Sequence, residues 1–255
     1  MADIPIPRDT AQAFRAAGRN CRNFGLLFDR FVGYGPDWTL EGGQKQGEAR
    51  RLVDACNSWA SDPAYKSWYQ AMRTRWQAVM RSAGAEPFEA TPEWRLVVGL
   101  GRESAFETGL TLHRVYGFPY VPGSALKGMT RAWAVATGAA GQQQLEEVFG
   151  KQEGAGLAVF FDALPVTPPR LKLDVMNPHY PDYYRPGRRL PPADWQSPVP
   201  VHFITVEQGT RFLFGTSARN GDTTKARQAG QWLQQALQEM GVGGKTTSGY
   251  GYWDV

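Results

Sequence analysis

The sequence predicts an α+β fold, in which a ferredoxin-like domain with an antiparallel sheet follows a helical region. Two patterns lead to this prediction. From residue 94 onward, segments typical of strands and helices follow one another in the order β-α-β-β(β)-α-β, the pattern of a ferredoxin-like domain. Before residue 94, apolar residues recur mainly at helical spacing. We therefore expect an N-terminal strand and helical region over residues 1–93, packed on a ferredoxin-like core over residues 94–255.

The N-terminal region contains one short apolar segment and two helical stripes. Residues 24–32 (FGLLFDRFV) are expected to form a strand. Apolar residues at i, i+3, i+4 and i+7 over 52–59 predict a helix. The Ser-Asp-Pro sequence at 61–63 predicts a second helix start, because Pro suits the first helical turn, and a second apolar stripe covers 65–80. We expect the Trp and Met residues of these stripes to pack against the core.

The core elements follow from apolar runs and their turn signals. Residues 95–100 (RLVVGL) predict the first strand, and residues 123–137 predict a helix with Ser124 as its N-cap candidate. Residues 156–163 predict the next strand. The remaining expected elements are strands over 199–206 and 210–215 joined by a tight turn, a helix over 224–240 and a last strand over 249–255.

A Pro-rich insertion separates the expected strands of the core at residues 164–200. Ten of the 18 prolines fall in it, so we expect neither a helix nor a central strand there. His179 and Tyr180 begin a stretch that mixes tyrosines with arginines, over 179–189. Aromatic rings and guanidinium groups together suit single-stranded RNA, whose bases stack and whose phosphates pair with Arg. The alternative is a surface loop whose tyrosines pack on the body of the protein.

Composition excludes several classes of protein. With 255 residues, 42% hydrophobic and 13% aromatic, the chain is too apolar to be disordered. No run approaches the ~18 apolar residues of a membrane span, and the first ten residues lack the apolar stretch of a secretory signal. The two cysteines, Cys21 and Cys56, have no CxxC spacing and suggest reduced thiols in a cytoplasmic protein. The formal charge of +4 permits a nucleic-acid partner without requiring one.

Several familiar motifs fail on inspection. The GGKTT segment at 243–247 lacks the first glycine of a P-loop, because Glu239 stands there, and it follows a helix. The three histidines, His113, His179 and His202, have no metal-ligand spacing, and no GxSxG elbow occurs. We therefore expect no metal, no cofactor and no catalytic residue.

The helix expected at 123–137 carries one candidate binding site. Its first turns contain Ser124, Lys127 and Arg131, and the two cations are four residues apart on one face. A helix start also offers free N–H groups and the positive end of the helix dipole, which suit a phosphate. The alternative is a capped helix with two solvated cations.

The glycine-rich segment at 241–253 carries the second candidate site. Gly243 and Gly244 are expected to let the backbone approach a partner closely, while Lys245 supplies charge and Thr246 a hydroxyl. In a ferredoxin-like domain this loop can meet the loop before the first helix, and together they would form a surface for a nucleic-acid backbone. The alternative is a flexible turn.

These two segments resemble motifs of the RAMP superfamily, the repeat-associated proteins of CRISPR systems. The resembling segments are GFPYVPGSALKGMTR at 117–131 and GVGGKTTSGYG at 241–251. A closer resemblance is to the family of sixth subunits of the type III-B (Cmr) CRISPR effector complexes, and it covers most of the chain. It is carried by LLFDRFV at 26–32, WRLVVGLG at 94–101, ETGLTLHRVYGFPYVPGSALKG at 107–128, DVMNPHY at 174–180 and DWQSPVPVHFITVEQGTRF at 194–212.

The resemblance implies an RRM-like core in a cytoplasmic prokaryotic ribonucleoprotein. It implies guide (CRISPR) RNA, target RNA and the other Cmr subunits as partners, no membrane, and a place toward the 3′ end of the guide beside the repeating backbone subunits. It also implies that this subunit is not the one that cuts target RNA. Residues 176–190 are one candidate for the family's projecting element. Expected RNA contacts are Ser124, Lys127, Arg131, Gly243, Gly244, Lys245 and Thr246, to which we add Arg114, His179 and Tyr180.

Two enzymatic alternatives stay open at this point. The first is a metal-independent RAMP endoribonuclease that processes CRISPR repeat RNA, in which His113 beside Arg114, or His179 beside Tyr180, supplies acid/base chemistry. The second is a carboxylate-dependent nuclease that uses Asp162 or Asp174.

Overall fold

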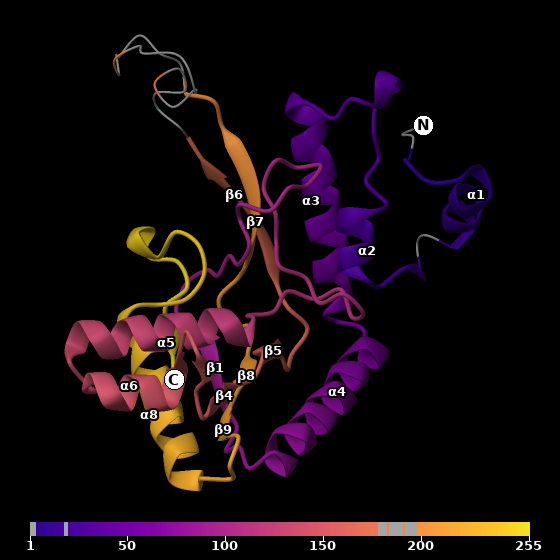
Figure 1. The fold of residues 1–255 in the computed structure, drawn as a ribbon. Helices are drawn as coiled ribbons and strands as arrows, with labels where there is room; N and C mark the ends of the chain where they lie inside the picture. Colours follow the sequence, from indigo (N-terminus) through magenta and orange to yellow (C-terminus); the bar gives the residue numbers. More distant parts are fainter. Residues whose placement is uncertain (1–3, 18–19, 178–182, 184–190, 192–197) are drawn as a thin grey trace.

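The fold is built on one four-stranded sheet (Figure 1). The computed structural model describes residues 4–17, 20–177, 183, 191 and 198–255. The strands of the sheet are β1 (Phe88–Pro92), β5 (Leu164–Pro165), β8 (Phe212–Phe214) and β10 (Trp253–Asp254). They lie side by side in the order β10-β1-β8-β5, and every neighbouring pair is antiparallel.

Two long helices complete the core, α5 (Gly123–Thr137) and α8 (Thr223–Glu239). They pack against each other, and the Trp133 indole N–H donates to the Glu239 carboxylate at 2.7 Å. In chain order the core is β1-α5-β5-β8-α8-β10. The predicted α+β class is confirmed, and this order is consistent with a ferredoxin-like core, although β1 and β5 are not the segments that were predicted as strands. The bounds predicted for α5 are confirmed, and α8 begins and ends one residue earlier than predicted.

Smaller elements surround α5 and α8. The chain after α5 forms a helix that the sequence analysis left unassigned and then returns toward the sheet. The strand predicted over 156–163 is observed as a shorter strand that pairs with a segment just before α8. These elements are α6 (Gln142–Phe149), β2 (Gly150–Lys151), β3 (Gly154–Ala155), β4 (Ala158–Phe160) and β9 (Thr216–Ala218).

The prediction of a strand at 95–100 is wrong. Only Leu96 in this segment forms a β-bridge, with Val206. The other main-chain groups are used by neighbouring loops, since the Gly244 N–H donates to the Val97 carbonyl at 2.7 Å and the Thr111 N–H to the Val98 carbonyl at 2.6 Å. The first strand of the sheet is β1, just before residue 94. The boundary expected between residues 93 and 94 stays a prediction.

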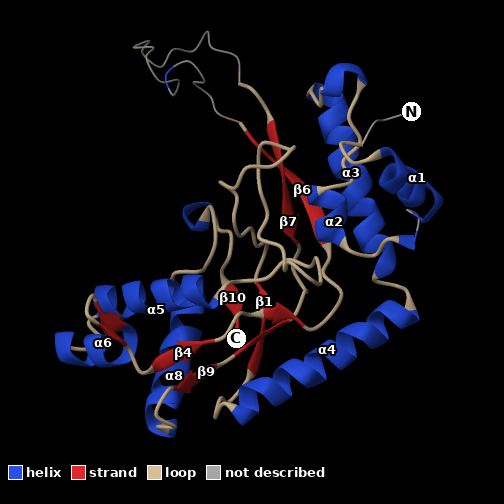
Figure 2. Ribbon diagram, turned by 45° about the vertical axis from the view of Figure 1, so that its right-hand side comes forward, coloured by secondary structure: helices blue, strands red, loops and turns tan. Residues whose placement is uncertain are grey.

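A two-stranded ribbon extends away from the sheet (Figures 1 and 2). It consists of β6 (Leu171–Met176) and β7 (Val201–Val206), paired antiparallel over six residues each. The segment 164–200, for which neither a helix nor a central strand was expected, therefore contains the ribbon strand β6, because the prolines flank the segment LKLDVM and do not interrupt it. The predicted hairpin of 199–206 with 210–215 is also absent from the described residues: β7 pairs with β6, whereas β8 pairs with β1 and β5.

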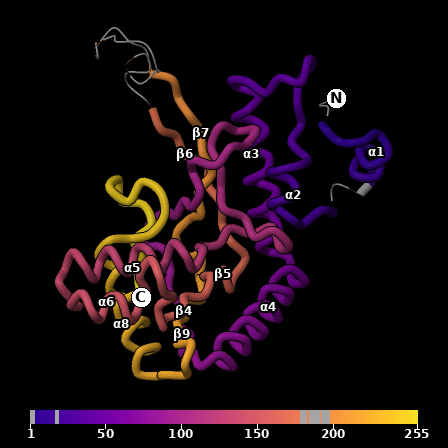
Figure 3. Tube along the Cα trace, viewed as in Figure 1, coloured from indigo at the N-terminus to yellow at the C-terminus, as the bar shows by residue number. Residues whose placement is uncertain are grey.

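The N-terminal helices lie beside the ribbon and the sheet (Figure 3). The predicted helical pair is confirmed as α3 and α4, and α3 contacts both ribbon strands. Residues 24–29 form a helix instead of the predicted strand, because the Asn23 side chain caps it by accepting from the Leu26 N–H at 2.9 Å. These helices are α1 (Arg8–Ala17), α2 (Phe24–Asp29), α3 (Gly42–Trp59) and α4 (Pro63–Ser82).

One hydrophobic cluster joins the N-terminal helices to the sheet. It includes Leu52 and Tyr69 of the helices together with Phe212 and Trp253 of the sheet. Within the described residues, no helix is both long enough and apolar enough to cross a membrane.

Candidate nucleic-acid interface

The start of α5 is capped by a carboxylate of the chain itself. Asp162 accepts a hydrogen bond from the Gly123 N–H at 2.7 Å. A Cβ on Gly123 would lie 2.2 Å from the Phe160 carbonyl oxygen, so only glycine fits here. The position that the sequence analysis offered to a phosphate is therefore occupied by Asp162, which gives this residue a structural role.

The cations of α5 remain at the surface. Ser124 and Arg131 are exposed and Lys127 is half-buried. Within the part of the chain that the structure describes, neither Lys127 nor Arg131 forms an ion pair. The two side chains are thus available to an external anion, although no ion pair among the described residues fixes the position of their charged groups.

Three glycines of the glycine-rich loop (residues 241–252), Gly241, Gly243 and Gly251, are required by the packing of the chain on itself. Gly243 has φ +110°, and a Cβ there would lie 2.4 Å from the Val97 carbonyl oxygen. The neighbouring Gly244 N–H donates to the same oxygen. The Gly251 N–H donates to the Arg95 carbonyl at 2.8 Å. The close approach predicted for these glycines is therefore made to residues 95–97, and their contact with RNA stays a prediction.

Lys245 and Thr246 lie at the turn of this loop. Lys245 adopts a left-handed conformation with φ +61°, and its ammonium group lies 5.8 Å from the Phe203 ring centre on β7. Thr246 begins a single helical turn, Thr246–Ser248, and is half-buried. In Figures 1 and 2 the loop rises from the side of α5 that faces the β6–β7 ribbon.

A cluster of three polar side chains, here called the Asp174 cluster (Arg95, Asp174 and Tyr250), ties the loop to the ribbon. Arg95 forms an ion pair with Asp174, and the Tyr250 hydroxyl donates to the same carboxylate at 2.6 Å. Burial opposes ionisation of Asp174, but hydrogen bonds from Tyr250, the Val175 N–H and Arg95 outweigh it and lower the pKa of Asp174. Burial and the bond to Asp174 raise the pKa of Tyr250 to about 12. Asp174 is thus a structural anchor between three segments.

His113 organises the turn that presents Arg114. Its Nδ1 accepts hydrogen bonds from the Val115 and Tyr116 N–H groups, each at 3.2 Å. Burial lowers the pKa of His113, and the nearby Asp162 partly opposes this. The ring is therefore neutral with its proton on Nε2, so neither nitrogen is a free base. Arg114 is exposed at the tip of the turn.

A groove beside this turn contains two arginines that the sequence analysis missed. We call it the arginine groove: it has a volume of about 330 Å³ and is lined by Arg30, Arg102 and Arg114 together with Asp29 and His113. The three arginines come from three separate segments, so no motif joins them in the sequence. Only the fold reveals that they share one site.

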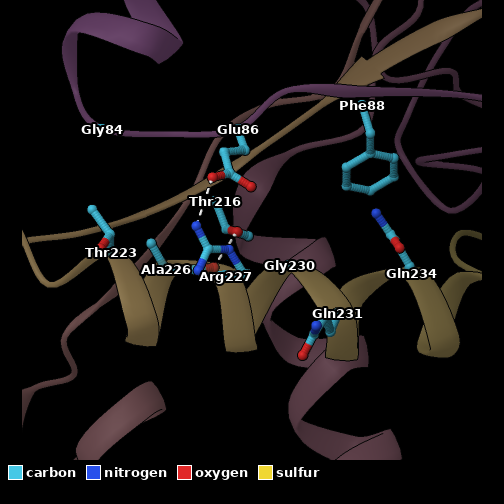
Figure 4. A pocket seen from close by; sticks show the side chains of 10 residues that line it. All are labelled: Gly84, Glu86, Phe88, Thr216, Thr223, Ala226, Arg227, Gly230, Gln231 and Gln234. Atoms are coloured by element: carbon cyan, nitrogen blue, oxygen red, sulfur yellow. Dashed lines mark hydrogen bonds and ion pairs between the residues drawn. The ribbon is translucent and has the colours of Figure 1, made fainter.

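The hollow drawn in Figure 4 is different in character. It has a volume of about 280 Å³ and lies between α8 and the chain around Glu86. Its two charged side chains, Glu86 and Arg227, pair with each other at 3.0 Å. The Thr216 hydroxyl donates to the Ala226 carbonyl at 2.8 Å. The two charges and the Thr216 hydroxyl are thus paired within the protein.

The remaining sequence candidates are either structural or lie outside the described residues. His179 and Tyr180, and with them most of the 176–190 segment, lie outside. His202 Nε2 lies 3.0 Å from the Gln46 amide nitrogen, which fixes this ring on β7. Among the residues that the structure describes, no group of three His, Cys, Asp or Glu side chains is placed to hold a metal ion.

Comparison with known proteins gives the following matches. The family model of the RAMP superfamily matches residues 71–253. The CRISPR system Cmr subunit Cmr6 of Pyrococcus furiosus is 32% identical over 249 residues, covering 73% of this chain and 72% of the relative. The Cmr6 subunit of Saccharolobus solfataricus is 30% identical over 132 residues, covering 50% of this chain and 43% of the relative.

A chain from the cryo-EM structure of the type III-B Cmr-beta complex bound to cognate target RNA shares the fold. Its TM-score is 0.59 with 21% sequence identity, and the match covers 96% of this chain and 89% of that one.

Proposed function

The chain belongs to the RAMP superfamily and, within it, to the Cmr6 family, and from this premise we propose that it is a non-catalytic RNA-binding subunit of a type III-B CRISPR ribonucleoprotein. In this role it holds guide RNA toward its 3′ end and contributes to the binding of target RNA in antiviral defence. Its partners are the guide and target RNAs and the other Cmr subunits, above all the backbone subunits. The complex acts in the cytoplasm.

One observation carries the proposal. Exposed cations of the candidate interface form no ion pair among the described residues, whereas the acid and base groups near them are already hydrogen-bonded within the protein. Arg114 and Arg131 are exposed. His113 and Asp162, by contrast, hold a turn and a helix start. Phosphate contacts position RNA without reading it, and base pairing between guide and target supplies the sequence specificity. A subunit of this kind needs cations at its surface and no general acid/base pair.

The β6–β7 ribbon supports a further part of the proposal. Residues 176–190 are one candidate for the family's projecting element, and β6 ends at Met176 at the far end of the ribbon (Figure 1). We take the ribbon as the stem that carries this element. The Asp174 cluster supports this, because it joins the stem to the glycine-rich loop on the same side of α5.

A denaturing gel tests the non-catalytic role. End-labelled CRISPR repeat RNA is incubated with the purified chain, with and without divalent metal, and the same mixtures are run on a native gel. We expect a shifted band on the native gel and intact RNA on the denaturing gel in both conditions.

A defined cut without metal would overturn the proposal in favour of the RAMP endoribonuclease. His113→Asn and His179→Ala would then identify the base, because Asn retains the acceptor for the turn but carries no titratable nitrogen. A cut only in the presence of metal would favour the carboxylate-dependent nuclease, with Asp162→Asn and Asp174→Asn as the variants to compare.

A further inference from the structure

The arginine groove is assembled from segments that the chain holds in fixed relation. Asn23 caps α2 and also donates from its side-chain amide to the Val115 carbonyl at 3.0 Å. The Gly25 N–H donates to the Gly117 carbonyl at 3.0 Å. These bonds join α2, which ends beside Arg30, to the turn that carries Arg114. Two of the three arginines thus belong to one hydrogen-bonded unit.

Arg102 is placed by a tight loop between two glycines. Its N–H donates to the Gly99 carbonyl at 3.0 Å. A Cβ on Gly109 would lie 2.5 Å from the Arg102 Cβ, and one on Gly99 would lie 3.1 Å from the Arg102 Cδ. The aliphatic part of Arg102 therefore lies over positions that tolerate only glycine, and Arg102 lines the groove.

The charges of the groove are unbalanced. It contains three arginines and one aspartate, Asp29, which leaves an excess of 3 − 1 = 2 positive charges. None of the three arginines forms an ion pair with a carboxylate of the described residues, whereas Arg22, Arg73 and Arg95 each do. His113 adds no charge, because its Nδ1 accepts two main-chain N–H bonds. An anionic ligand would neutralise this excess.

The chemistry of the groove favours a phosphodiester chain. Guanidinium groups bind phosphate oxygens through two parallel hydrogen bonds, and three of them in an open groove suit successive phosphates. Exposed apolar side chains accompany the arginines, because Leu26 lines the groove and is 44% exposed, and Val115, the residue after Arg114, is 68% exposed. Such side chains suit the sugar and base faces of a nucleic-acid strand. Resting on the proposed function, we infer that the groove formed by Arg30, Arg102 and Arg114 binds the phosphate backbone of single-stranded RNA.

Salt-dependent RNA binding tests this assignment. The full chain is titrated into a fluorescein-labelled single-stranded RNA, and anisotropy is followed between about 50 and 200 mM salt. The test variant carries Arg30→Gln, Arg102→Gln and Arg114→Gln. The control carries Arg81→Gln, Lys151→Gln and Arg219→Gln, which remove the same charge from exposed positions outside the groove. Circular dichroism melting checks that both variants fold.

We expect the groove variant to bind RNA about 30-fold more weakly at the lowest salt, because three charge-assisted contacts are lost. The slope of log affinity against log salt should fall by about 2 units, since each single-strand phosphate contact contributes about 0.7. The control variant should change affinity by less than about threefold.

Three outcomes would overturn the inference, and they are distinguishable. If the groove and control variants bind RNA with equal affinity and the wild type binds strongly, the groove is not the RNA-binding site. The proposed function would then still stand. Equal competition by poly-glutamate and RNA at the same charge would show an unspecific anion site, and an acidic protein partner would then be the better assignment. Absence of RNA binding by the wild-type chain, even with the protein in large excess over the RNA, would overturn both the groove and the proposed function.

Discussion

The glycine-rich loop and the arginine groove differ in what their polar groups do. In the loop, Gly243 and Gly244 pack against Val97, and Tyr250 is bonded to Asp174. In the groove, by contrast, Arg30 and Arg102 have no carboxylate partner among the described residues. The glycine-rich loop therefore has the stronger sequence motif, but most of its groups are already used in contacts within the protein. The lesson is that residue type suggests a binding surface, but the pairing of its groups determines whether it is available.

The largest effect should come from filling the space of a packed glycine. Gly243→Ala places a methyl group 2.4 Å from the Val97 carbonyl oxygen at a φ of +110°, and we expect the free energy of unfolding to fall by about 3 kcal/mol. Gly249→Ala is the matched control, because φ is +86° but nothing lies within 4 Å of its Cβ. It should cost about 1 kcal/mol. Urea denaturation measures both, and equal losses would show that the loop does not depend on this packing.

Removal of the central carboxylate of the Asp174 cluster should have the next largest effect. Asp174→Ala leaves Arg95 without its partner, and side chains that are 15% exposed keep enough solvent to limit the loss to about 2 kcal/mol of unfolding free energy. Tyr250→Phe removes one hydrogen bond and should cost about 1 kcal/mol. A loss from Asp174→Ala no larger than that from Tyr250→Phe would mean that the ion pair contributes nothing.

The same cluster predicts a pH dependence. The pKa of Asp174 is lowered in the folded protein, so its stabilisation is present above the unfolded value of about 3.9 and is lost as the pH falls through the lower folded value. The difference in unfolding free energy between the wild type and Asp174→Asn should therefore be full at pH 7 and shrink below about pH 4. A constant difference over this range would contradict the lowered pKa.

A smaller effect is expected at the turn that presents Arg114. His113→Ala removes the acceptor for the Val115 and Tyr116 N–H groups and should cost about 1 kcal/mol of unfolding free energy. His113→Asn keeps a side-chain acceptor at the same place in the turn and should recover much of this loss. Thermal melts of the two variants measure the difference. If they are equally unstable, ring packing rather than the acceptor is what matters.

The smallest effect should come from single half-buried cations at or near the glycine-rich loop. Lys127→Ala should weaken RNA binding about threefold, and Lys245→Glu somewhat more because it reverses a charge. Salt titrations of RNA affinity measure both variants. If both variants keep the RNA affinity and the salt slope of the wild type, Lys127 and Lys245 do not belong to the RNA-binding site.

The sequence predicts the elements whose local signals agree with their packing. The bounds of α5 follow from Pro122 before it and from Gly138 after it, which adopts φ +67° as a left-handed cap. Residues 24–29 were predicted as a strand because a short apolar run looks the same in a helix and a strand. The ribbon strand β6 was missed because prolines on both sides were taken to exclude it.

The candidate site was predictable only in part. The single sequence points to Arg114 and to the cations of α5, since they lie in recognisable segments. Arg30 and Arg102 could not be found in this way, because they lie far from Arg114 in the sequence and meet it only in the fold. Long-range hydrogen bonds such as that between Gly25 and Gly117 join α2 to the turn of Arg114, and Arg102 lines the same groove. Nor does the sequence reveal that Asp162 occupies the helix start, which is a contact between distant segments.

The central claim is that cations without an ion-pair partner among the described residues make the RNA contact. The most direct test is ultraviolet cross-linking of the full chain to single-stranded RNA, followed by mass spectrometry of the adducts. We predict adducts on peptides that contain residues 100–116, where His113 and Tyr116 stack at a ring-centre distance of 4.6 Å beside Arg114. Adducts confined to the 241–252 loop, with none at 100–116, would contradict the account.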